Sequence, residues 1–236
     1  FRHERGLYFG AYSALQGWDS LGAHIGLPVV VNEVNLKPFC GFEHPMDPIA
    51  RASETLVALT WLRGDVKEAT HIIQLTLSNE LLFPKHLLSA IGDDYAKLAM
   101  ISKTGIVYPE IQAFGKTAPI KPSIEFVPQE FTSLAVNQWY ASASNRSGTK
   151  FPLLLEDLKT RGIISSNNKS DYKNDVYESE TGEIVLNTKT ETMTVITPRL
   201  EGVILKEDKP VKLNTLEIRS CTKPATVALA TLDRSQ

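Results

Sequence analysis

The 236-residue sequence predicts an α/β fold whose last quarter forms a separate antiparallel β domain. Up to about residue 103, two kinds of segment follow each other along the chain. Some have apolar residues at three- and four-residue steps, which is the pattern of a helix, and others are short and either β-branched or alternately apolar and polar, which is the pattern of a strand. From residue 175 onward, short apolar segments are separated by polar turns, which indicates an antiparallel sheet of the sandwich type. We therefore expect three parts: an α/β part at 1–103, a loop-rich connector with a short helix at 104–174, and the β domain at 175–236.

The first predicted helix is followed by predicted strands. Its apolar stripe consists of Leu7, Tyr8, Ala11, Ala14, Leu15 and Trp18, and Glu4 lies on the same stripe one turn earlier. The segment LGAHIGL at 21–27 is small and apolar at most positions, which is typical of a strand buried on both faces of a parallel sheet. The β-branched run at 29–31 predicts another strand.

A second helix is predicted to begin at Pro48, because Asp47 can cap the helix and proline suits its first position. It should end near Gly64 and carry its core side chains at Ile49, Ala52, Leu56, Val57 and Leu59. Asp65 and Glu68 suggest a second capping box. The alternation in THIIQLTLS predicts a half-exposed strand, and FPLLLEDLKTRG predicts a helix that ends at Gly162.

Charge and composition exclude several classes of partner. The chain has 25 basic and 27 acidic residues, so its net charge of −2 provides no electrostatic case for nucleic acid or an anionic membrane surface. The histidines show no metal-ligand spacing, and no Gly-x-Ser-x-Gly elbow or phosphate-binding glycine loop occurs.

Cys40 and Cys221 are expected to be unrelated buried thiols, although a long-range disulfide is the alternative. The sequons at Asn145 and Asn168 would be exposed loop sites.

Several short motifs follow one another along residues 1–205. They are Glu4, Ala11-Tyr12, Gln16, Trp18-Asp19, Asp47-Pro48, Arg63-Gly64-Asp65-Val66, Thr181-Gly182-Glu183 and Thr197-Pro198-Arg199. In this order and spacing they resemble the large TIM-barrel glycoside hydrolases related to β-galactosidase and agarase-like enzymes. Two departures stand out: LGAHIGL replaces an aromatic-rich eighth strand, and Gly17 occupies a position where an acid is common.

The resemblance implies a fold and an activity. Residues 1–103 would be the last βα units of a (β/α)8 barrel, and 175–236 would be an incomplete β-sandwich-type domain. The enzyme would cleave glycosidic bonds in a poly- or oligosaccharide with two carboxylates and no cofactor or metal. The family's catalytic pair lies at the ends of the fourth and seventh strands, both expected upstream of Phe1. We further expect a secreted or periplasmic protein, partnered by the remainder of the barrel or by a second copy.

Barrel geometry selects the candidate site residues, because active sites lie at the C-terminal ends of the strands. Glu4, at the start of a helix after a strand, should lie near the sugar, unless it only interacts with the helix dipole. His24 could bond a sugar hydroxyl, or it could be a satisfied histidine at a strand end. Within VVVNEVN, Asn32 would orient the substrate and Glu33 would protonate the leaving oxygen, or Glu33 is a surface carboxylate.

Two other interpretations compete with the enzyme. One is a non-catalytic carbohydrate-binding or structural module that keeps the scaffold without the reaction. The other is an unrelated α/β protein in which the motifs coincide by chance. Trp18 is expected to be a packing residue at the core or its rim rather than a platform for sugar stacking.

Overall fold

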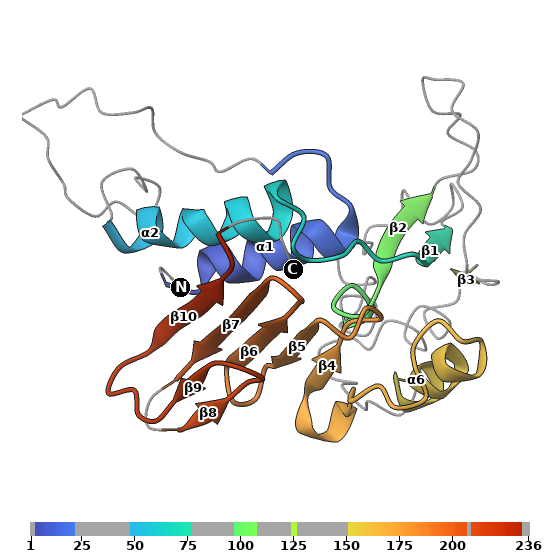
Figure 1. Ribbon diagram of the computed structural model, residues 1–236. Coiled ribbons are helices and arrows are strands. Elements are labelled where there is room, and N and C mark those ends of the chain that lie inside the picture. Colours follow the sequence, from blue (N-terminus) through green and yellow to red (C-terminus); the bar gives the residue numbers. More distant parts are fainter. Residues whose placement is uncertain are drawn as a thin grey trace, which may run out of the picture. The chain divides into compact units, whose positions relative to one another are not determined.

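The computed structural model describes residues 3–21, 48–76, 97–107, 124–126, 151–206 and 209–232 (Figure 1). Within these ranges the protein is mixed α/β, and its antiparallel sheet has five strands in the order β10-β7-β6-β5-β4. The chain divides into two compact units, which we describe separately. Unit 1 comprises Phe1–Glu68 and Glu183–Gln236, and unit 2 comprises Ala69–Gly182.

Helix α1 (Arg5–Gln16) confirms the first predicted helix, and Leu7, Ala11 and Leu15 on its stripe are fully buried. It ends at Gly17, whose backbone is left-handed, with φ 64°. The N–H groups of Gly17 and Trp18 donate to the carbonyls of Ala14 and Ser13, a common way to end a helix. An L-residue would be strained in this conformation, so the glycine at position 17 has a local structural reason.

Helix α2 (Pro48–Val57) begins at the predicted proline and continues through the π-turn η2 (Ala58–Leu62). It runs parallel to α1, since Gly6 lies against Ser53 and Gly10 against Val57 and Thr60 (Figure 1). The Gly6 N–H donates to Ser53 Oγ over 2.6 Å. The strands predicted at 21–27 and 29–31 lie outside the described residues, except for Leu21.

The packing face of α2 differs from the prediction. The buried residues of α2 and η2 are Ala50, Ser53 and Thr60, whereas Ile49, which we expected in the core, is 45% exposed. Small side chains form the contact because the glycines of α1 allow the two backbones to approach closely. The larger apolar residues of α2 therefore lie beside the helix contact.

The sheet strands of unit 1 pair antiparallel in the order β10-β7-β6-β5, as predicted for this part of the chain. Helix α1 covers one face, where the methyl groups of Leu7 approach Gly202 so closely that a Cβ there would lie 3.0 Å from them. On the other face, the Glu201 carboxylate accepts the N–H groups of Thr215 and Leu216, which lie between β8 and β9. The strands are β5 (Ile184–Asn187), β6 (Thr192–Ile196), β7 (Leu200–Leu205), β8 (Val211–Lys212), β9 (Glu217–Ile218) and β10 (Ala225–Ala230).

Unit 2 contains a parallel sheet with the order β2-β1-β3. Strand β1 (Ile72–Thr76) confirms the predicted strand, but β2 (Lys103–Val107) and β3 (Ile124–Phe126) fall largely in the segment expected to be loop-rich. Helix α6 (Phe151–Thr160) ends just before Gly162, as predicted. The unit also holds the 3-10 turn η4 (Tyr172–Asn174) and strand β4 (Val176–Glu178), and its core is formed by Ile73, Leu98, Ile101, Leu155, Leu158, Ile163, Ile164 and Tyr177.

Two smaller predictions fail on burial. Asn168 is buried rather than exposed, and its Nδ2 donates to the carbonyls of Glu178 and Ser179. Cys221 forms no disulfide, but it is only partly buried. Cys40 and Asn145 lie outside the described residues. Among the residues that the structure describes, no helix combines the length and apolar character needed to cross a membrane.

Candidate functional site

The N-terminal end of α1 is where the sequence places a sugar contact. Glu4 is the N-cap residue, but its backbone is helical (φ −77°, ψ −31°) and its side chain makes no capping hydrogen bond. The carboxylate is about one-third exposed, and its Oε1 lies 3.7 Å from Nε2 of His3. The structure therefore places a partly solvent-accessible acid beside an imidazole at this helix end.

Two neighbouring elements hold the start of α1 in place. The carbonyl of His3 accepts a hydrogen bond of 2.7 Å from Thr226 Oγ1 on β10, and one of 3.4 Å from Ser53 Oγ on α2. Ser53 also accepts the Gly6 N–H, so it bridges the first turn of α1 to α2. A site held by hydrogen bonds from rigid elements keeps its side chains close to one geometry.

Burial controls the charge of the imidazole at this end of α1. Desolvation lowers the pKa of His3 below its ordinary 6.5, and the negative charge of Glu4 offsets part of this effect. The ring is therefore neutral at neutral pH and can either donate or accept a hydrogen bond. Within the described residues, its Nε2 and the Nη1 of Arg5 are buried without a hydrogen-bond partner. Both atoms could pair with a polar ligand or with another part of the protein.

A groove of about 260 Å³ runs between α1 and α2 beside this end of the helix. We call it the α1–α2 groove, and most of its lining is apolar. Phe9 and Leu62, which both line the groove, are 46% and 72% exposed, and large apolar side chains exposed in one groove are unusual. The lining residues are Arg5, Gly6, Phe9, Leu21, Ala50, Ser53, Glu54, Val57, Ala58, Trp61 and Leu62.

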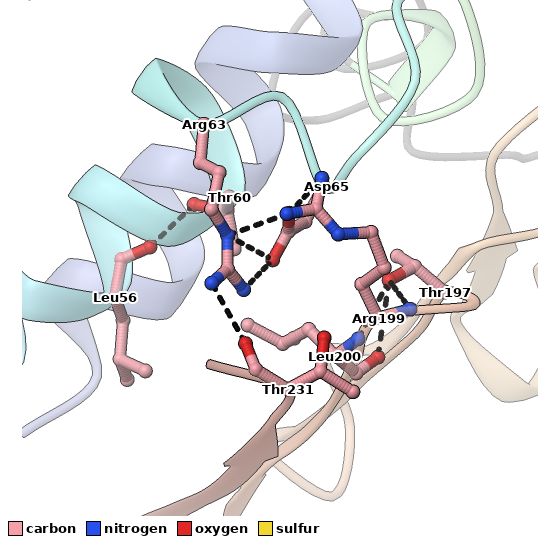
Figure 2. A network of polar contacts seen from close by, with 8 residues as sticks. All are labelled: Leu56, Thr60, Arg63, Asp65, Thr197, Arg199, Leu200 and Thr231. Atoms are coloured by element: carbon pink, nitrogen blue, oxygen red, sulfur yellow. Dashed lines mark hydrogen bonds and ion pairs between the residues drawn. The ribbon is translucent and has the colours of Figure 1, made fainter. Parts of the chain in front are cut away.

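A second feature of unit 1 is a polar network around Asp65, whose side chain is fully buried (Figure 2). Arg63 donates to this carboxylate from Nε, over 2.9 Å and 3.1 Å to its two oxygens, and from Nη2. Nη1 of Arg199 lies 3.3 Å from Asp65 Oδ1, and Nη1 of Arg63 donates to the carbonyl of Thr231 over 2.8 Å. The hydrogen bond to Asp65 raises the pKa of Arg63. The network ties the end of η2 to the ends of β7 and β10.

This arrangement corrects the predicted capping box. No helix begins at Asp65, and its carboxylate pairs with two arginines instead of capping backbone N–H groups. On the sheet side, Thr197 Oγ1 accepts the N–H groups of Arg199 and Leu200 and shapes the turn before β7 (Figure 2). The Arg-Gly-Asp-Val and Thr-Pro-Arg motifs of the sequence thus meet in one network.

The Thr-Gly-Glu motif at residues 181–183 also contributes to the contact between the helix pair and the sheet, which we call the seam. Oε2 of Glu183 accepts the backbone N–H of Lys67 over 2.7 Å, across 116 residues of sequence, and Oε1 lies 3.6 Å from Nζ of Lys67. Burial raises the pKa of Glu183, and the hydrogen bond and charge of Lys67 offset part of that rise. The fold therefore brings the three motifs together, and their hydrogen bonds and ion pairs join the helix pair to the sheet.

Of the four predicted site residues, the structure describes Glu4 alone. His24, Asn32 and Glu33 lie outside the described residues. Sequence reasoning missed His3 and Arg5, which flank Glu4, because their burial and unpaired atoms depend on β10 and α2. Among the described residues, no cluster of His, Cys, Asp and Glu could hold a metal ion.

No protein-family model matches the chain, and no curated protein or solved structure matches it.

Proposed function

We propose that this chain forms the last βα units of a (β/α)8 barrel and the following β domain of a glycoside hydrolase. The enzyme would cleave glycosidic bonds in a poly- or oligosaccharide by a two-carboxylate mechanism. The observation that carries the proposal is the meeting of the Arg-Gly-Asp-Val, Thr-Gly-Glu and Thr-Pro-Arg motifs at one seam. If these motifs join the barrel to its β domain, related enzymes would need all of them, although they lie far apart in the sequence.

The helix pair supports the barrel. Consecutive outer helices of a (β/α)8 barrel run parallel and are separated in sequence by one strand. Helices α1 and α2 are parallel neighbours, and 17–47 is long enough to contain such a strand. The α1–α2 groove has the apolar lining that the outward-facing side chains of barrel strands would cover. A β-sandwich built on the five-stranded sheet would complete the second domain.

The end of α1 would then lie at the substrate side of the barrel, because a helix that follows a strand begins there. Glu4 would accept hydrogen bonds from sugar hydroxyls, while the neutral His3 and the Nη1 donor of Arg5 would bond others. His24 would bind a further hydroxyl. These groups bind and orient the sugar, and the two catalytic carboxylates would come from preceding strands.

Asn32 and Glu33 stay a secondary proposal for an orienting amide and a proton donor. Glu33 would protonate the leaving oxygen, and the distance to its partner carboxylate would decide the stereochemistry. A separation of about 5–5.5 Å predicts retention, and about 6.5–9.5 Å predicts inversion. We further propose a secreted or periplasmic enzyme of polysaccharide degradation that needs no cofactor.

The test is release of reducing ends from a panel of polysaccharides by the complete protein that contains these residues. We expect hydrolysis, and we expect Glu4→Gln to raise KM about tenfold while kcat changes less. Glu191→Gln is the control, since Glu191 is exposed and pairs only at the surface with Lys206. Glycan binding without turnover would replace the enzyme by a non-catalytic binding module. The proposal would be overturned if the complete protein neither bound nor hydrolysed any of the polysaccharides.

A further inference from the structure

A second cavity lies at the opposite end of the helix pair from Glu4, where α1 and η2 end. Its volume is about 550 Å³, within the range of about 300–1,000 Å³ that small-molecule sites occupy. Its lining residues are Ala14, Gly17, Trp18, Asp19, Trp61, Gly64, Val66, Lys67 and Glu68. All of them belong to unit 1, and none has a role in the proposed sugar-cleaving site.

Two tryptophans give this cavity its apolar wall. Trp18 is 49% exposed, so the expectation that it packs in the core or at its rim does not explain the accessible part of its ring. Trp61 donates its Nε1–H to the carbonyl of Trp18 over 3.0 Å, which satisfies its polar atom and fixes the ring next to that residue. The half-exposed indole of Trp18 offers a flat surface for stacking.

The polar residues of the cavity carry both signs of charge. Asp19, Lys67 and Glu68 are exposed, and they supply hydrogen-bond acceptors and an ammonium donor next to the indoles. Lys67 lies 3.6 Å from the Glu183 carboxylate, so part of its charge is already balanced. Asp19 and Glu68 are acidic and Lys67 is basic, so the lining has no excess of positive charge that would attract an anionic ligand.

Sugar rings match this combination of groups. A pyranose has apolar C–H faces that stack on an indole, and hydroxyls around its edge that both donate and accept hydrogen bonds. We propose that this cavity is a second saccharide site that holds a neutral oligosaccharide by stacking on Trp18. The saccharide class rests on the proposed function, whereas the cavity and its indoles do not. The site would retain a polysaccharide chain away from the bond that is cleaved.

The test follows the indole N–H signals of Trp18 and Trp61 by NMR in the ¹⁵N-labelled complete protein that contains these residues, during titration with neutral hexasaccharides of cellulose, xylan, mannan and agar. We expect at least one of them to shift the Trp18 and Trp61 signals. Trp18→Ala should weaken that binding about tenfold, and Trp18→Phe should retain most of it. Leu229→Ala is the matched control, since Leu229 is 51% exposed on β10 and lies away from the cavity lining.

Three outcomes would overturn this site: no shift with any neutral hexasaccharide, unchanged binding by Trp18→Ala, or tighter binding of a uronic acid oligomer. Failure here is distinguishable from failure of the proposed function. Hydrolysis that depends on Glu4, with no binding at Trp18, would remove only the second site. Binding at Trp18 without hydrolysis by the complete protein would remove only the enzyme.

Discussion

At the residue scale, two glycines decide how closely α1 and α2 pack. A Cβ on Gly6 would lie 1.7 Å from the carbonyl oxygen of Ser53, and one on Gly10 would lie 2.1 Å from Oγ1 of Thr60. Real contacts are never this short, so any side chain here would push the helices apart. The loss of the Gly6–Ser53 hydrogen bond would follow, and with it one of the contacts that position the start of α1.

We predict that Gly10→Ala destabilises the protein by about 2–3 kcal/mol, because the added methyl group overpacks the helix contact. Urea unfolding of the full chain measures this. Gly105→Ala is the matched control, because a Cβ there would meet nothing within 4 Å and should change stability by less than about 0.5 kcal/mol. Equal stability of the two variants would contradict the close helix contact.

At the element scale, the Asp65 network joins the helix pair to the sheet. We predict that Asp65→Asn costs about 3–5 kcal/mol, because a buried ion pair loses one partner and two arginines keep their charge. Thermal and urea unfolding measure the loss. The exposed pair Lys206–Glu191 is the control, and Lys206→Ala should cost less than about 1 kcal/mol. A loss at Asp65 no larger than this would show that the network does not hold the elements together.

Glu183, at the same seam, predicts how stability depends on pH. Its pKa in the folded protein is raised above 4.5 by burial, so the folded state holds this proton more tightly than the unfolded state does. Its contribution to stability is therefore greatest below pH 4.5 and falls as the pH rises through the folded pKa. Glu183→Gln, which can still accept the Lys67 N–H, should flatten that decline. Unfolding free energies from pH 4 to 8 test this, and an unchanged slope would contradict the buried environment of Glu183.

The element scale also separates what the sequence alone could predict from what it could not. The helix α1, the proline start of α2, the strand at Ile72–Thr76 and the glycine end of α6 depend on local patterns, and all are confirmed. Trp18, which we placed on the stripe of α1, lies beyond the end of that helix and is 49% exposed. The prediction of the packing face of α2 was wrong, because the glycines of a neighbouring helix made Ala50 and Ser53 the contact residues. Asp65 has the local pattern of a helix cap, but Arg199 lies far along the chain and determines its role.

The candidate site follows the same division. Glu4 was identified from its place at a helix start, which a local pattern and a family resemblance both provide. The unpaired atoms of His3 and Arg5, and the exposure of Trp18, depend on which elements pack against α1. No periodicity in the sequence contains that information.

At the scale of the whole molecule, unit 1 is a junction between a helix pair and a sheet. Its helix pair is tied to an antiparallel sheet by Asp65 and Glu183, with Glu4 and Trp18 near opposite ends of α1. One end of the pair would face the bond that is cleaved, and the other would hold the polysaccharide. This division of roles requires α1 and α2 to be consecutive outer helices of a closed barrel.

A crystal structure of the complete protein with a bound oligosaccharide tests that requirement most directly. We expect a parallel barrel strand that follows α1 and precedes α2 in the sequence and covers the α1–α2 groove, and a sugar at the barrel face where Glu4 lies. The proposal would be contradicted by a structure in which the segment that links the two helices forms no barrel strand and the groove stays open.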